Sequence, residues 1–209
     1  MPDPTIRHLT QRTPHPSQLK ALAHPARLQM LEMLRLDGPG TSTSLAARLG
    51  MNSGTVSYHL RQLALHGFIE DDPEHESKRE RWWRATHEFT HVPYQEPQDG
   101  EDRQARQAYL HAYVLVNVTQ LQEALSERAD LPRRWASVTE DSDWTIWLTP
   151  SEVRALMERL TATIREVADA APRDREHAPE GCEQYTLQLH GFPRPRRLVP
   201  EHRVINRKA

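Results

Sequence analysis

The segment His87–His91 reads His-Glu-Phe-Thr-His and matches the H-E-x-x-H motif of zinc hydrolases letter for letter. On a helix, histidines four positions apart bind one zinc ion, and the glutamate remains available as a general base. The preceding run from Arg81 to Thr86 is strand-like, however, and Pro93 follows closely. We therefore expect an accidental match at the end of a strand, and a zinc-dependent hydrolase is the weaker alternative.

A second set of residues could bind a polyanion. The stretch from Thr41 to Ile69 contains no acidic residue, and Ser77–Arg84 carries four basic residues and one acidic residue. The formal net charge is -2, so this basic character is local. Both stretches could build a surface that faces the phosphates of nucleic acid.

The acid-free stretch also contains a helix with two distinct faces. Between residues 54 and 66, Val56, Leu60 and Leu63 share one face at helical spacing, while Tyr58 and Arg61 point away from it. Asn52 and Ser53 can cap its start, and Gly67 suits its end. The pattern indicates a helix that is buried on one side and polar or basic on the other.

Helices and a hairpin surround this segment. Short helices are expected over residues 19–23, from Pro25 to about residue 36, and over 43–49, where Gly50 ends the last of them. An extended run begins at Phe68, passes through a polar turn over 71–77 and resumes over 79–86. These are the parts of a winged helix-turn-helix.

The blocks Leu19–Leu28, Thr43–Gly50 and Gly54–Ile69 resemble the ArsR-type winged-helix transcription regulators in their residues, order and spacing. The resemblance implies a dimeric DNA-binding regulator whose helix over 54–66 enters the major groove and whose hairpin contacts the backbone. We expect DNA contacts from the outward residues of that helix and from the hairpin: Ser53, Thr55, Ser57, Tyr58, Arg61, Gln62, Lys78, Arg79 and Arg81.

Some regulators of this type sense metals through cysteines in the second helix or through His and Asp pairs on the dimer helix. Here Leu28–Leu34 contains no cysteine, and His111 has no histidine or carboxylate three or four residues away. The single cysteine, Cys182, cannot form an internal disulfide and suits a cytoplasmic protein. We expect no catalytic residue, no metal site and no cofactor.

The second half of the chain begins with a long helical pattern over residues 102–129. A wide apolar stripe on this helix predicts a homodimer interface formed by Leu110, Val114, Asn117, Leu121 and Leu125. Asn117 would pair with its counterpart across the dimer. Residues 143–148 and 185–190 alternate like strands, and Thr149 starts a helix through a capping box. Some ArsR-like regulators carry similar segments.

The predicted fold class is mainly α with a small β component (α+β). The expected organisation is a flexible arm (1–16), a winged helix-turn-helix domain (17–92), a linker (93–100), a C-terminal α+β dimerisation and sensing domain (101–193) and a basic flexible tail (194–209).

The expected function is sequence-specific regulation of transcription by a homodimer on double-stranded DNA, with a palindromic operator and no membrane association. A small-molecule effector, its identity, and the choice between repression and activation are left open. The other alternative is a winged-helix module that binds proteins without reading DNA.

Overall fold

The computed structural model describes residues 10–75, 80–172 and 177–198. The described residues up to 178 belong to one compact unit, and the described residues from 179 onward belong to a second. Within the described ranges, no helix is both long and apolar enough to cross a membrane.

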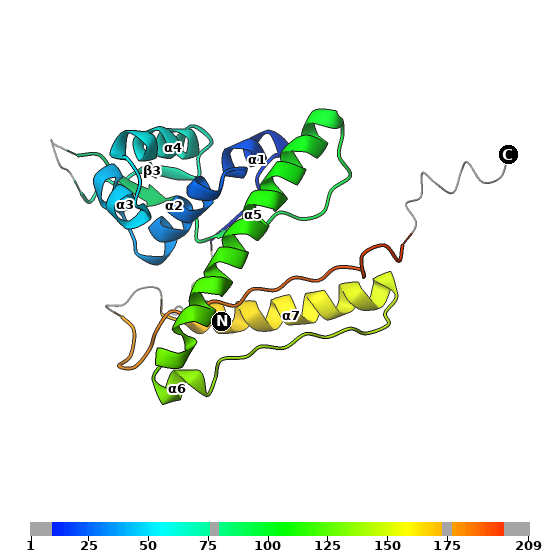
Figure 1. Ribbon diagram of the computed structural model, residues 1–209. Helices are drawn as coiled ribbons and strands as arrows, with labels where there is room; N and C mark the ends of the chain where they lie inside the picture. Colours follow the sequence, from blue (N-terminus) through cyan, green and yellow to red (C-terminus); the bar gives the residue numbers. More distant parts are fainter. Residues whose placement is uncertain (1–9, 76–79, 173–176, 199–209) are drawn as a thin grey trace, which may run out of the picture. The chain divides into compact units, whose positions relative to one another are not determined.

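Four helices open the first unit: α1 (Pro16–Leu22), α2 (Pro25–Leu36), α3 (Ser42–Leu49) and α4 (Ser53–Leu65) (Figure 1). The side chains of His24, Thr41 and Asn52 accept backbone hydrogen bonds at the starts of α2, α3 and α4. The prediction that Asn52 caps the helix over residues 54–66 is confirmed. Apolar side chains from all four helices make one core: Leu19, Leu22, Met30, Leu31, Leu34, Leu45, Val56, Leu60 and Leu63.

A three-stranded antiparallel sheet covers this core in the order β2–β4–β3, with β2 (Gly40–Thr41), β3 (Ile69–Asp71) and β4 (Trp82–Ala85). Strands β3 and β4 are the predicted wing, with Ile69 opposite Ala85. Trp83 is buried in the core, whereas its neighbour Trp82 stacks on His75 with the ring centroids 4.4 Å apart. The short strand β2 was not predicted.

A second, parallel pair of strands joins the start of the chain to the end of the wing. Gln11 in β1 (Gln11–Arg12) pairs with Phe89 in β5 (Phe89–Thr90). The predicted flexible arm over residues 1–16 is therefore wrong at its C-terminal end, because ladder hydrogen bonds hold residues 11 and 12. Residues 1–9 lie outside the described ranges.

Helix α5 (Gly100–Glu127) packs on α1 and α2 (Figure 1). One of its stripes is buried in this contact: Ala105, Tyr109, Ala112 and Val116. Further along, Gln120 donates a hydrogen bond of 2.6 Å to Glu32 on α2. The predicted boundary between residues 92 and 101 therefore does not separate two compact units, since the long helix completes the core of the winged domain.

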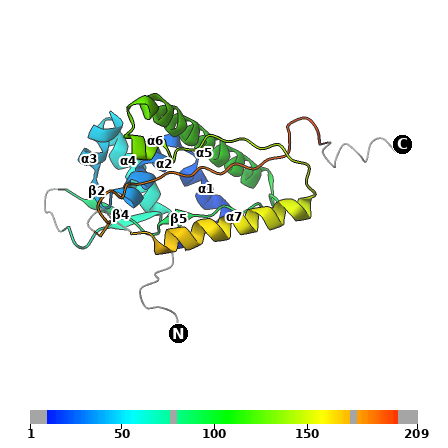
Figure 2. The same cartoon turned by 90° about the horizontal axis from the view of Figure 1, so that it is seen from below.

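The chain continues through a 3-10 turn (Arg128–Asp130) and α6 (Arg133–Ala136) to α7 (Pro150–Ala170), which lies alongside β5 (Figure 2). Thr149 and Glu152 form the predicted capping box at its start. All residues of α7 are described, and none of them is buried.

The two predicted strands of the second half are absent. Residues 143–148 and 185–190 are described and belong to no strand. Alternation of apolar residues indicates a half-buried strand only when a neighbouring strand bonds its N–H and C=O groups. Within each described unit, neither segment has that neighbour, and Trp144 and Trp147 are exposed.

Candidate nucleic-acid interface

The candidate interface is built on the two faces of α4. Val56, Leu60 and Leu63 are fully buried and fix the helix on the core. On the other side Tyr58 is 54% exposed, and Arg61 is also exposed. Of the remaining predicted contact residues on this helix, Ser53 and Thr55 are exposed. Ser57 and Gln62 are half-buried. The structure therefore brings all six predicted α4 residues to one accessible region.

Arg61 carries the positive charge of this surface. Its Nη2 lies 3.3 Å from Ser57 Oγ, one helical turn earlier, which leaves most guanidinium donors directed to solvent. An arginine in this position can donate two hydrogen bonds to one guanine edge. The helix therefore presents a group suited to reading bases, held on a rigid element.

The wing differs from the prediction in its charge. Arg81 forms an ion pair with Asp71 on the neighbouring strand, and its guanidinium lies 4.1 Å from the centroid of the Trp83 ring. The hydrogen bond from Arg81 lowers the pKa of the Asp71 carboxyl. Arg84 is paired in the same way with Glu70, at 2.8 Å. Acidic residues of β3 thus compensate Arg81, which directly precedes β4, and Arg84 within β4.

Two predicted phosphate contacts on the wing, Lys78 and Arg79, lie outside the described residues. The adjoining Glu80 accepts a hydrogen bond of 2.7 Å from the Thr43 hydroxyl on α3. This contact fixes one side of the wing against the helix that precedes the recognition helix.

A histidine pair lies behind the exposed face of α4. The rings of His24 and His59 are 4.4 Å apart, and burial lowers the pKa of both imidazoles, with the charge of Arg27 adding to the effect. The Nδ1 atom of His59 and the Nε atom of Arg27 are buried without a hydrogen-bond partner among the described residues. The sequence gives no signal that these two rings touch.

The C-terminal end of α4 is held by residues from the start of the chain. Arg12 donates hydrogen bonds to the carbonyl oxygens of His66 and Gly67, and Gln18 donates to His66 as well. The guanidinium of Arg12 also lies 4.7 Å from the centroid of the Phe68 ring. These carbonyls are the groups that a helix end leaves unpaired. Sequence reasoning missed Arg12 because its partners lie in a distant part of the chain.

The apparent zinc motif lacks the helical geometry that H-E-x-x-H chemistry requires. Residues 87–91 include β5 and no helix, and His87 is a buried residue whose Nδ1 lies 2.7 Å from Thr86 Oγ1. Burial, with the charges of Arg35 and Arg12, lowers the pKa of His87 to about 4. Among the described residues, no three His, Cys, Asp or Glu side chains are grouped to hold a metal ion.

Four of the five predicted dimer residues lie on an exposed stripe of α5. Each is about half exposed: Leu110, Val114, Leu121 and Leu125. Asn117 is the exception, because it is buried within the single chain. Its pairing across a dimer stays a prediction.

Comparison with known proteins agrees with this architecture. Residues 22–72 match the family model described as Helix-turn-helix domain. Over 56 residues the chain is 45% identical to the HTH-type transcriptional regulator NmtR of Mycobacterium tuberculosis, an alignment that covers 27% of this chain and 46% of that regulator. The chain thus spans less than half of the relative it matches.

Several solved structures are also similar, among them the following two. The transcriptional repressor BigR from Xylella fastidiosa is 21% identical, with 45% of this chain and 78% of that chain covered at a TM-score of 0.30. Lactococcus lactis ZitR, as an apo mutant, is 16% identical, with 72% and 88% covered at a TM-score of 0.30. Because both TM-scores are low, neither likeness adds to what the residues themselves show.

The sheet topology and the match over residues 22–72 define a winged helix-turn-helix domain in the first half of the chain. The predicted resemblance and the predicted α+β fold class are confirmed at this level. The matched residues include α2, α3, α4 and β3, which are the elements that carry and position the recognition face.

Proposed function

We propose that the chain is a homodimeric regulator of transcription that binds double-stranded DNA sequence-specifically in the cytoplasm. The observation that carries the proposal is the outer face of α4, which is polar or basic and free of carboxylates over a fully buried core face. Such a face can enter the major groove without repulsion from phosphates.

In this reading α4 supplies base contacts through Arg61, Tyr58 and the hydroxyls near its start. The wing supplies backbone contacts through Lys78, Arg79 and Arg81, of which Arg81 must share its charge with Asp71. Phosphate contacts orient the protein without carrying sequence information, whereas base contacts distinguish sequences.

Dimerisation would provide the second recognition helix that a palindromic operator needs. The exposed stripe of Leu110, Val114, Leu121 and Leu125 on α5 supports this assignment, because its opposite stripe is already buried against α1 and α2. An apolar stripe of this kind on a long helix is typical of a helix–helix interface.

No catalytic role is proposed. The zinc motif matches hydrolases in sequence but not in structure, because His87 is buried, hydrogen-bonded and next to a strand. Metal analysis of the purified protein, together with His87→Ala, tests this point. If the parent protein bound stoichiometric zinc and the variant did not, the zinc-dependent hydrolase would become the better hypothesis.

The test of DNA reading uses duplex selected from random oligonucleotides, followed by titrations at several salt concentrations. Arg61→Ala should cost about 1 to 3 kcal/mol on the selected site and much less on scrambled duplex. Arg79→Ala should weaken both duplexes alike and lower the salt slope by about one. A protein that binds neither selected nor random duplex at low salt would favour the protein-interaction module.

A further inference from the structure

Two imidazole rings meet behind the recognition helix, at the junction of α2 and α4. His59 belongs to the buried face of α4, between Val56 and Leu63, and is only 6% exposed. Its ring centroid lies 4.4 Å from that of His24, the residue that precedes α2. The Nδ1 atom of His59 is buried without a hydrogen-bond partner among the described residues. A proton on this ring would therefore bury a charge that has no acceptor at Nδ1.

His24 has a structural role that requires a neutral ring. Its Nδ1 accepts a hydrogen bond of 3.2 Å from the backbone N–H of Ala26, and this bond caps the start of α2. An imidazolium ring carries hydrogen on both nitrogens and cannot accept the bond. The charge would also lie at the positive end of the helix, whose first turn contains no acidic residue. Protonation of His24 therefore removes the cap of α2.

A permanent cation borders the histidine pair. Arg27 lies in the first turn of α2, where its Nη2 donates a hydrogen bond of 2.9 Å to the carbonyl oxygen of Lys20. Its Nε atom is buried with no hydrogen-bond partner in the described part of the chain. Burial is the main cause of the lowered pKa of both imidazoles, and the charge of Arg27 adds to it. A proton on either ring thus meets a cation instead of a carboxylate.

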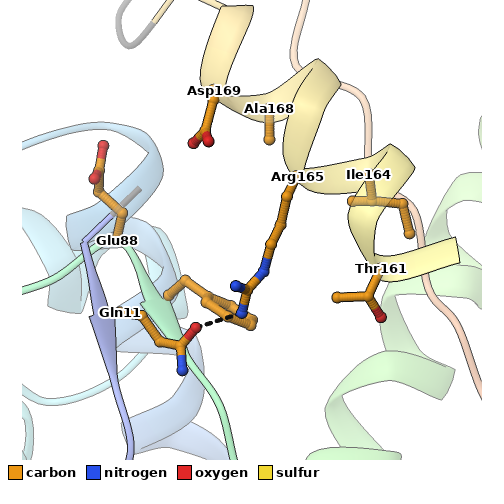
Figure 3. Close-up of a pocket in the computed structure, with 8 residues that line it drawn as sticks. Gln11, Glu88, Thr161, Ile164, Arg165, Ala168 and Asp169 are labelled. Atoms are coloured by element: carbon orange, nitrogen blue, oxygen red, sulfur yellow. Dashed lines mark hydrogen bonds between the residues drawn. The ribbon is translucent and has the colours of Figure 1, made fainter. Parts of the chain in front are cut away.

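The other charged groups on the elements that pack on α4 have partners elsewhere. The acidic groups and their partners are Glu32 with Gln120, Glu70 with Arg84, and Asp71 with Arg81. The basic groups and their partners are Lys20 with Glu101, Arg35 with the carbonyl of His87, and Arg48 with Asp37. Two further carboxylates, Glu88 and Asp169, line a cavity of about 440 Å³ between the β1–β5 ladder and α7, and neither His24 nor His59 lines it (Figure 3).

We propose that the pair of His24 and His59 is a proton-sensitive support of the recognition helix, and that its protonation weakens DNA binding. The effect on DNA rests on the proposed function. The neutral rings keep α2 capped and complete the buried face of α4. A proton on either ring removes the cap or charges that face, so α4 loses the fixed position from which it contacts bases.

The direction of the pH dependence follows from the lowered pKa of both rings in the folded chain. An unfolded or loosened chain binds the proton more readily than the folded junction does. The support is therefore complete above about pH 6.5, the ordinary value of an imidazole, and is lost progressively as the pH falls below it.

Anisotropy titrations of the selected duplex from roughly pH 7.5 to 5, at constant ionic strength, test the effect on DNA. The affinity of the parent protein should fall about tenfold, because an imidazole that must stay neutral costs up to a factor of ten for each pH unit below its unfolded pKa. Asparagine is a good N-cap and cannot be protonated, so His24→Asn should reduce the fall to about threefold. His59→Gln should act in the same direction.

Two histidines outside the pair provide controls. His111→Gln changes an exposed position on α5, and His87→Gln removes a buried imidazole that contacts Thr86 and Phe68. Both variants should follow the parent protein. Parallel curves for the parent and His24→Asn would overturn the proposal. Tighter DNA binding on acidification would overturn it as well, because the phosphates would then favour the protonated rings.

Amide hydrogen exchange on the full chain without DNA tests the support itself. After correction for the intrinsic effect of pH, exchange in α2 and α4 should accelerate several-fold on acidification in the parent protein and less in His24→Asn. Such acceleration in a chain that binds no DNA overturns the proposed function and leaves the support standing. DNA binding with equal acceleration in both proteins removes the support alone.

Discussion

Nη2 of Arg12 donates a hydrogen bond of 2.7 Å to the carbonyl oxygen of His66, 54 positions later in the chain. This contact joins strand β1 to the last turn of the recognition helix, where carbonyl groups have no partner within the helix. A cation at this end also interacts favourably with the helix dipole. Strand β1 therefore helps to hold α4 in place.

Arg12→Ala should lower the free energy of unfolding by about 1 to 3 kcal/mol, because two carbonyls lose a charged donor and Phe68 loses the stacked guanidinium. Urea unfolding followed by circular dichroism measures the change. Arg103→Ala, an exposed arginine on α5, is the control and should stay within about 0.5 kcal/mol of the parent protein. Equal effects of the two substitutions would show that the cap is unimportant.

Asp71→Asn should strengthen DNA binding. The substitution removes a negative charge from the wing and releases Arg81 from its ion pair, so that its guanidinium can reach a phosphate. We expect tighter binding to selected and scrambled duplex alike, and a salt slope steeper by up to about one. Anisotropy titrations at several salt concentrations measure both quantities, with Glu158→Gln as a charge-matched control. An unchanged slope would place Arg81 away from the DNA backbone.

His87 should make the stability depend on pH in the acidic range. Its pKa is lowered to about 4 in the folded chain, against about 6.5 when unfolded, so the unfolded chain binds the extra proton between these values. The stabilisation is therefore present above pH 6.5 and is lost as the pH falls toward 4. The loss from this group should be about 1 to 3 kcal/mol.

His87→Gln, which stays neutral at every pH, isolates this contribution. Its free energy of unfolding should fall less steeply between pH 6.5 and 4 than that of the parent protein. Some slope should remain, because the pKa values of His24 and His59 are also lowered. Urea titrations across this range provide the comparison, and parallel curves for the two proteins would contradict the assignment.

The double substitution Val114→Ala with Leu121→Asp should convert a dimer to monomers. Both positions are exposed in the single chain, so the winged domain should keep its fold. Light scattering measures the mass, and circular dichroism confirms the helix content. Leu115→Asp is the control, because Leu115 is similarly exposed but lies about 100° from Val114 around the helix. A double variant that remains dimeric would move the interface to another surface.

The local signals of the first half predict its four helices and the wing. Pro25, Gly50 and Gly67 mark helix boundaries through their backbone constraints, and the spacing of Val56, Leu60 and Leu63 marks a buried face. The outward positions of α4 follow from the same periodicity. These features depend on neighbours within a few residues, which a sequence displays directly.

Other outcomes depended on contacts between distant residues. The apolar residues of α5 form two stripes, and only the fold decided that the stripe with Tyr109 and Val116 packs on α1 and α2. Asn117 is also buried, although helical spacing groups it with the exposed stripe. Periodicity shows that a face is apolar, but it does not specify which partner covers it.

The sequence by itself determined the helices, the wing and the acid-free face of α4, because capping, backbone restriction and side-chain periodicity act over a few residues. Tertiary structure decided which charges remain available and what holds the recognition helix. Arg81 is paired with Asp71 through strand register, and Arg12 reaches His66 through the β1–β5 ladder. It also left residues 143–148 without a strand partner, since β-pairing requires a neighbour that local sequence cannot supply.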